Sequence, residues 1–533
     1  MSVAIGLAPR SMPARLALRP GFHRRMLGWV QGTIHSQTRP HVRTWASSTT
    51  TEPVVDQPLA CTWLTTTPEQ LTPDDILSSF PISAPNPPLE YIPILLFTPA
   101  FAHWADTKSA FLEQWLNQFY HKASDRLSPI HAVAAIIDRL PYNHARGLSG
   151  EATESEGVSI LLARAENILG KAVAPRQVRS VETEEPTLLF SFQKDAKDPQ
   201  TTHQPVHEIG LRLANTIFLN GKENTLVGAR WSHDLSLGRL RLEDSVDLST
   251  CSVTVSPVSI GRSLELPLHP VGERRKVISS MGNILRQISK HADGTSNEPM
   301  PASSELEKEL PRYIAEQGIT DQRVSVWALI ETSVESPYLK SSDSQSSLAK
   351  SIEMGAKLHR VMSGGGGWGK KQGLLSLDPE MSFGQPVNGS MQSLYKVLST
   401  NTEGITDEVD SPLKQPTGIQ DLSTLSQAAE PGDYVQFFVS VEEHQPHSDS
   451  RTWSPSGSPG RSLSCDFGVV SNADTLLSQT TRQKDLTTVP NFFGALSEKA
   501  ITYLQPLAEP HSNVFESRTK IDVPGSRVAL KLQ

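Results

Sequence analysis

The sequence predicts an α/β domain near the N-terminus, followed by an α+β region that is rich in short strands and carries inserted low-complexity loops. Two observations lead to this fold class. Between residues 91 and 185, apolar runs of strand length alternate with a helical repeat, which is typical of a βαβ unit around a buried sheet. From about residue 187 the apolar runs become shorter and are separated by turn residues, which favours short strands joined by tight connections.

Residues 1–45 are expected to be a mitochondrial targeting presequence. There is no acidic residue before Glu52, and residues 1–45 contain seven arginines and no lysine. Acid-free, arginine-rich N-termini that contain serine are read by the mitochondrial import machinery. The sequence after Arg43 also resembles a matrix-processing site. The alternative interpretation is a basic arm that binds nucleic acid.

Removing residues 1–45 takes the net charge from −8 to −15. Nonspecific nucleic-acid binding depends on neutralising phosphates and usually shows as a basic surplus, so nucleic acid is disfavoured as a partner. The three cysteines form no CxxC pair, which excludes a cysteine-built zinc ribbon. The most apolar stretch, residues 91–104, is too short for a transmembrane segment. We therefore expect a protein of the mitochondrial matrix, or one peripheral to the inner membrane.

Residues 46–90 are rich in threonine and proline and are expected to be a linker with one short helix. This helix should begin after Thr72, because threonine is a good N-cap and Pro73 suits the first helical position. The α/β domain follows over residues 91–185. Its expected elements are a strand at 92–98, a helix at 109–121, and strands at 131–138 and 158–163.

Residues 186–291 are predicted to form a β-rich region that ends in a helix. Short strands are expected at 188–192, 215–219, 225–229, 239–242 and 252–256. Asn220-Gly221 separates two of these strands and favours a type I′ hairpin turn, because both residues accept positive φ angles. Apolar residues recur at helical spacing over 274–290 and predict the closing helix.

Residues 305–533 are expected to form an α+β domain that contains a glycine-rich loop at 363–373 and disordered inserts. The expected helices cover 305–315 and 348–362, and the expected strands cover 324–330, 374–377, 434–441, 467–470 and 528–532. The low-complexity inserts are residues 336–347, 399–426 and 444–464.

The glycine-rich loop is the candidate binding site for an anion or another ligand. The candidate residues are Gly364, Gly365, Gly366, Gly367, Trp368, Gly369, Lys370 and Lys371. The spacing satisfies most of a Walker A pattern, but Lys371 stands where Ser or Thr should bind magnesium. A P-loop also follows a strand and opens a helix, whereas a helix is expected before this loop and a strand after it.

Two interpretations of the loop remain. In the first, the glycine amides and both lysines bind an anion, and Trp368 stacks on a base. In the second, which we favour, the glycines form a close-packed or mobile connection and Trp368 is buried, since consecutive glycines cost backbone entropy on ordering.

Other candidate sites are weaker. A metal-like set lies in a polar loop, where such residues are usually solvated; it comprises Glu442, Glu443, His444, His447 and Asp449. Residues 143–146 could line a pocket at a sheet edge, although an exposed turn is the commoner outcome. The sequence has no GxSxG, GxGxxG or HExxH motif and no evident Cys–His pair. We therefore assign no catalytic residue, metal ligand or cofactor, and we lean against an enzyme.

Three blocks of sequence resemble signature blocks of uncharacterised fungal mitochondrial precursor proteins. These blocks are residues 215–231 (NTIFLNGKENTLVGARW), 281–287 (MGNILRQ) and 362–378 (MSGGGGWGKKQGLLSLD). The resemblance implies a mitochondrial compartment. It brings no activity with it, and no functional residue is carried over from it.

The leading functional hypothesis is a non-catalytic factor in mitochondrial gene expression or respiratory-complex assembly that acts through contacts with other mitochondrial proteins. One alternative is a small-molecule or nucleotide-binding protein, or an enzyme, that uses the loop from Gly364 to Lys371. The other alternative is an RNA-binding protein with a local basic patch.

Overall fold

The computed structural model describes a defined set of residues, all within the compact unit Asp56–Gln533. The described residues are 60–79, 90–120, 128–142, 154–174, 185–194, 206–222, 224–234, 236, 238–292, 297–319, 324–332, 344–364, 373–381, 383, 391–399, 427–441, 462–471, 485–511 and 514–533. The expected presequence and most of the expected inserts lie outside these residues.

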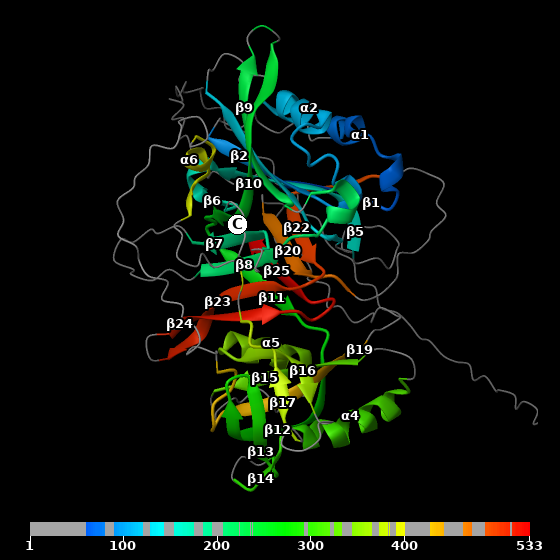
Figure 1. Ribbon diagram of the computed structural model, residues 1–533, viewed down its shortest axis with the longest axis vertical. Helices are drawn as coiled ribbons and strands as arrows, with labels where there is room; N and C mark the ends of the chain where they lie inside the picture. Colours follow the sequence, from blue (N-terminus) through cyan, green and yellow to red (C-terminus); the bar gives the residue numbers. More distant parts are fainter. Residues whose placement is uncertain are drawn as a thin grey trace, which may run out of the picture. The chain divides into compact units, whose positions relative to one another are not determined.

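The fold class expected from the sequence is wrong, because the described structure is mostly β. Strands make up 54% of it and helices 18%, and the strands form large sheets and a closed six-stranded barrel. The structure is therefore a β architecture and not the expected α/β domain followed by an α+β region (Figure 1).

The largest sheet has 14 strands and gathers segments from most of the described chain. Its main path is β21 (Thr487–Pro490), β1 (Ala60–Thr65), β5 (Glu154–Arg164), β2 (Tyr91–Phe97), β3 (Ile130–Ile136), β9 (Leu226–Asp234), β10 (Arg239–Val255), β7 (Thr187–Gln193), β8 (Val206–Arg212), β23 (Ile501–His511) and β24 (Val514–Ile521). Off this path, β4 (Leu140–Pro141) pairs with β5, and β6 (Ile168–Ala172) pairs with β10 and with β18 (Gln392–Ser393).

The expected βαβ unit exists locally. Strands β2 and β3 pair in parallel, and α2 (Ala110–Phe119) connects them. The apolar side of α2 is buried with the face of the sheet that carries Trp63 and Phe97. The neighbours β5 and β9 run antiparallel to this pair, so the sheet is mixed and the unit does not define an α/β domain.

Short helices complete this part of the fold. They are η1 (Pro68–Gln70), α1 (Pro73–Ser78), η2 (Pro99–Phe101), η5 (Ala165–Asn167), α3 (Ile217–Asn220) and α6 (Leu394–Ser399). As expected, α1 begins after Thr72; a capping box with Asp75 fixes that end, since each residue satisfies the other's backbone N–H. The segment expected to be a linker thus also contributes β1 and α1.

A separate four-stranded sheet packs into the same core as one face of the large sheet. Its order is β11 (Ile260–Glu265), β25 (Arg527–Leu532), β20 (Leu463–Val469) and β22 (Phe492–Ser497). Phe467 and Phe493 from this sheet meet Phe190 of β7, with ring centroids 5.1 and 5.3 Å from that ring.

The six-stranded barrel is closed by antiparallel ladders throughout. Its cyclic order is β12 (His269–Met281), β19 (Tyr434–Val441), β15 (Val324–Glu331), β16 (Lys357–Gly364), β17 (Leu375–Leu377) and β13 (Ile284–Ser289), which returns to β12. The short β14 (Pro299–Pro301) adds to β13. Small and aliphatic side chains fill the interior, among them Val277, Leu285 and Ala328.

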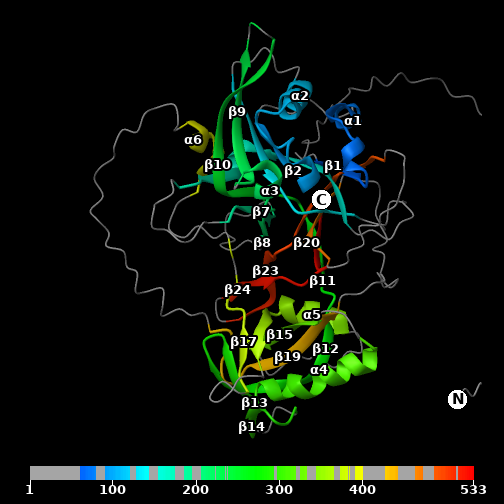
Figure 2. The same ribbon diagram turned by 45° about the vertical axis from the view of Figure 1, so that its right-hand side comes forward.

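Two helices flank the barrel (Figure 2). Helix α4 (Ser303–Gln317) packs on β12, and α5 (Ser344–Glu353) lies against β23. The outer face of β15 contributes to the core of the large sheet through Trp327, whose indole N–H donates to the Asp522 carboxylate at 2.7 Å. This hydrogen bond therefore links the barrel to the residue that follows β24.

Several local expectations fail. The helix expected over 274–290 is the β12–β13 hairpin, which turns at Gly282 with a φ of +58°. The strand expected at 215–219 is instead helix α3, and Asn220-Gly221 ends this helix rather than joining two strands, since Gly221 takes the left-handed conformation that caps a helix. The helix expected over 348–362 ends with α5 at Glu353, and β16 begins four residues later.

Candidate functional site

The structure places only one candidate residue of the glycine-rich loop. Gly364 is the last residue of β16 and pairs with Leu375 of β17, while residues 365–372 lie outside the described part of the chain. The loop thus connects two antiparallel neighbours of the barrel. A P-loop follows a strand and opens a helix. The element before this loop is a strand, β16, rather than the expected helix, but the element after it is also a strand, β17. The loop therefore lacks the helix that a P-loop requires.

At the end of the barrel where β16 reaches Gly364, two neighbouring strands separate. Strand β15 pairs with β16 from Ile330 to Trp327, and the last pair is Trp327 with Arg360. Beyond that pair, residues 324–326 continue along β19, whereas residues 361–364 continue along β17. Within the described residues, the facing edges of these two segments have no ladder to each other.

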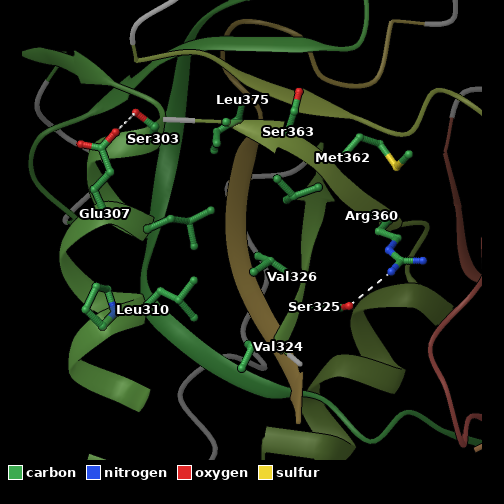
Figure 3. A pocket seen from close by; sticks show the side chains of 14 residues that line it. Ser303, Glu307, Leu310, Val324, Ser325, Val326, Arg360, Met362, Ser363 and Leu375 are labelled. Atoms are coloured by element: carbon green, nitrogen blue, oxygen red, sulfur yellow. Dashed lines mark hydrogen bonds between the residues drawn. The ribbon is translucent and has the colours of Figure 1, made fainter. Parts of the chain in front are cut away.

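A groove of about 680 Å³ occupies the space where the strands separate (Figure 3). Three segments line it, together with one residue of β17. They are residues 324–326 of β15, 360–364 of β16, Ser303, Leu306, Glu307, Leu310 and Pro311 of α4, and Leu375. We call this space the barrel groove. Leu310 points from α4 across it toward Val324 and Val326, so its lining is mainly aliphatic.

An ion pair holds α4 on the barrel as one wall of the groove. The Glu305 carboxylate lies 2.8 Å from Nε of Arg275 on β12, and these side chains are 3% and 10% exposed. The carboxylate also accepts the backbone N–H of Glu273 at 2.8 Å. Arg275 in turn donates to the carbonyl of Lys290 at 2.6 Å, so the pair ties α4 to both strands of the β12–β13 hairpin.

The close approach of α4 to β12 depends on Gly272. This glycine has a φ of +70°, and a Cβ in its place would lie 2.9 Å from Cγ of Glu305. Only a residue without a side chain fits both the left-handed backbone and the space that the carboxylate fills.

Pro311 lies inside α4 and removes one helical hydrogen-bond donor. It has no N–H to donate to the carbonyl of Glu307, one turn earlier, and both residues line the groove. The α4 wall therefore offers a carbonyl oxygen without its helical donor among aliphatic side chains.

Of the described residues that line the groove, one is cationic and one is anionic, and they lie on opposite walls (Figure 3). Arg360 donates to the hydroxyl of Ser325 at 3.2 Å, and its guanidinium lies 5.7 Å from the ring centroid of Trp327. On the α4 wall, Glu307 accepts the hydroxyl of Ser303 at 2.7 Å. Both charges are thus held in place by neutral partners, and neither is neutralised by the other.

The far side of β16 is fixed by a buried histidine. Nδ1 of His359 donates to the carbonyl of Asp378 at 2.8 Å, and burial lowers the pKa of this imidazole, so it stays neutral. The ammonium of Lys520 on β24 lies 2.5 Å from the Asp378 carboxylate. Burial raises the pKa of the Asp378 carboxyl, but the hydrogen bond and charge of Lys520 lower it, and the net pKa is below the usual value. Two contacts therefore hold Asp378, the residue that follows β17.

The other predicted candidates form no site among the described residues. The metal-like set at 442–449 and residues 143–146 lie outside the described part of the chain. Within that part, no group of three or more His, Cys, Asp or Glu side chains could hold a metal ion.

The sequence predicted most of the segments that line the groove, but it did not predict that these segments lie next to one another. Helix α4 and strands β15 and β17 were all expected close to their observed positions, whereas β16 was expected to be helical. The one local signal was Pro311 within an amphipathic helix, next to the groove-facing Leu310.

Comparisons with known proteins add no family to this description. No protein-family model, curated protein or solved structure matches the chain. Among the described residues, no helix has the length and apolar character needed to cross a bilayer.

Proposed function

We propose that this protein is a non-catalytic mitochondrial factor, in the matrix or at the inner membrane surface, that binds other mitochondrial proteins. We further propose that the barrel groove holds an extended segment of the partner chain. The observation that supports this is the separation of β15 and β16 beside an aliphatic groove. Such a role suits gene expression or the assembly of respiratory complexes, where a factor holds partner segments before they are built into a larger assembly.

Backbone chemistry favours an extended peptide over a compact ligand. Among the described residues, the segments 324–326 and 361–364 have a ladder on one side only, so the facing side offers donors and acceptors that a second ladder would otherwise satisfy. A strand added to an exposed edge forms main-chain hydrogen bonds there, while side-chain pockets select alternate residues.

The walls define the side chains that such a segment needs. Leu306, Leu310 and Val326 line the inner side of the groove, so the residues that point inward should be aliphatic. Residues that point outward meet Ser325, Arg360 and Met362, and Met362 is 62% exposed. The preferred ligand is therefore an extended segment in which aliphatic and polar residues alternate.

A binding experiment tests the groove. A labelled peptide, acetyl-Val-Ser-Val-Gln-Val-Ser-Val-amide, is titrated into the full-length protein and followed by fluorescence anisotropy. The control peptide has proline in place of both serines, which removes two ladder donors and should abolish binding. We expect the parent peptide to bind and the proline peptide not to bind.

Two methionines provide matched variants. Met362 lines the groove and Met281 does not, yet they are 62% and 61% exposed and both belong to barrel strands. Met362→Ala should weaken peptide binding about fivefold, because about 1 kcal/mol of apolar contact is lost. Met281→Ala should leave it unchanged. Equal effects of the two substitutions, or no binding of the parent peptide, would refute the groove as the site.

The compartment needs its own test. Radiolabelled full-length chain and a chain without residues 1–45 are offered to energised, isolated mitochondria. We expect only the full-length chain to become protease-protected and shortened. Protection of the truncated chain to the same extent would refute the presequence.

A further inference from the structure

The cation of the barrel groove stands at its narrow end. Arg360 is the β16 member of the last β15–β16 pair, so the two strands separate immediately beyond it. A segment that enters the groove as a strand therefore has its leading residue beside this guanidinium. Figure 3 shows Arg360 on the β16 side, with its side chain held toward Ser325.

Arg360 is held in position without an ionic partner. Its exposed guanidinium interacts with a hydroxyl and an aromatic ring, and no carboxylate among the described residues lies within 4.0 Å of it. The Asp522 carboxylate attracts Arg360 from beyond this distance, and it already accepts the indole N–H of Trp327. Arginine presents a planar fork of donors that fits a carboxylate with two parallel hydrogen bonds.

We propose that the barrel groove selects extended segments that carry a carboxylate at their leading end, and that Arg360 binds this carboxylate. This inference rests on the proposed function of the groove. The carboxylate comes either from an aspartate or glutamate side chain or from the C-terminus of the segment, and both offer the same planar pair of oxygens. Glu307 on the opposite wall repels a carboxylate, so it disfavours the reversed placement of the acidic group.

Three peptides separate the two sources of the carboxylate. The first is the neutral parent, acetyl-Val-Ser-Val-Gln-Val-Ser-Val-amide. The second has glutamate in place of the serine that precedes the last valine, and the third is the parent with a free C-terminus in place of the amide. We expect at least one carboxylate peptide to bind about tenfold more tightly than the parent at about 50 mM salt. This preference should shrink as salt screens the pair. Preference for the second peptide assigns a side chain, and preference for the third assigns the terminus.

The matched arginine for this test is Arg312. It is exposed on α4, paired with Glu309 and Glu316, and does not line the groove. Arg360→Gln should abolish the preference for the carboxylate peptide, and Arg312→Gln should retain it. Arg360→Lys should keep a reduced preference, since an ammonium holds the charge but lacks the fork. If Arg360→Gln does not fold, the lysine variant and the salt dependence of the native protein still decide.

The outcomes distinguish the two proposals. If the parent peptide binds in the groove and neither carboxylate peptide binds more tightly, Arg360 is not a carboxylate site and the proposed function stands. If the Arg360→Gln variant still binds a carboxylate peptide more tightly than the parent peptide, Arg360 is likewise not the carboxylate site. If none of the three peptides binds, the proposed function itself fails.

Discussion

Substitution of Glu305 by glutamine should release α4 from the barrel. The carboxylate is 3% exposed and lies 2.8 Å from Arg275, which is itself 10% exposed. Breaking a buried ion pair costs about 3–5 kcal/mol, and we expect the low end, about 3 kcal/mol, because the exposed Glu273 carboxylate still lies 3.3 Å from Arg275. At about 1.4 kcal/mol per tenfold change, a loss of about 3 kcal/mol should make the amides of α4 exchange with solvent on the order of 100-fold faster.

Hydrogen–deuterium exchange with mass spectrometry measures this local opening directly. Glu316→Gln is the control on the same helix, because Glu316 is 63% exposed and its pair with Arg312 is a surface pair worth about 0.5 kcal/mol. The double variant Glu305→Leu/Arg275→Met should restore slow exchange, since apolar residues can replace a buried pair at little cost. Unchanged α4 exchange in Glu305→Gln, or a double variant as open as the single one, would refute this reasoning.

Three further predictions concern pH, packing and nucleotides. Burial raises the pKa of Asp466 from 3.8 to about 7, so the folded state prefers the protonated acid and loses stability as pH rises from about 4 to about 7. Asp466→Asn should flatten this part of the profile of melting temperature against pH, and an unaltered slope would contradict it. Gly157→Ala should greatly reduce soluble yield, because its Cβ would overlap the backbone carbonyl of Trp63; a fully soluble variant would show that this strand contact adjusts. Magnesium-ATP should leave the melting temperature unchanged, because the glycine loop precedes a strand rather than a helix; a shift that Lys370→Ala/Lys371→Ala removes would revive the nucleotide hypothesis.

Local patterns in the sequence were sufficient for many single elements. Apolar runs and capping signals correctly indicated α1, β2, α2 and β3, because each rests on contacts within one segment or between neighbours. The parallel pairing of β2 with β3 was predictable for the same reason. The overall class was not, since it depends on partners far apart in the chain, such as β1 with β21.

The β12–β13 hairpin shows why periodicity misled. Val277, Leu285 and Ile288 satisfy a helical spacing, but in the barrel they point inward from two strands. Gly282 in the left-handed region marks the turn, and the spacing argument gave this residue no weight. Short apolar runs fit both periods, and closure of the barrel by β12–β13 pairing decided between them.

Only one residue of the candidate site, Gly364, could be singled out from the sequence. The sequence singled out the glycines that begin with Gly364, and this residue does line the groove. The groove itself arises because β15 follows β19 while β16 follows β17, which is a property of three ladders rather than of any motif. No motif around Arg360 indicated a binding role. The role proposed for it depends on Trp327, its partner in the β15–β16 ladder, which is distant in the sequence.

Residue-resolved amide exchange in the presence of the Val-Ser-Val-Gln-Val-Ser-Val peptide tests strand addition to the barrel groove most directly. With saturating peptide, the amides of residues 324–326 and 361–364 that point away from β19 and β17 should exchange at least about tenfold more slowly, because a new ladder protects them. The amides of Ala328 and Leu329, which already lie in the β15–β16 ladder, should not change. Binding of the peptide without protection of either segment would contradict the account.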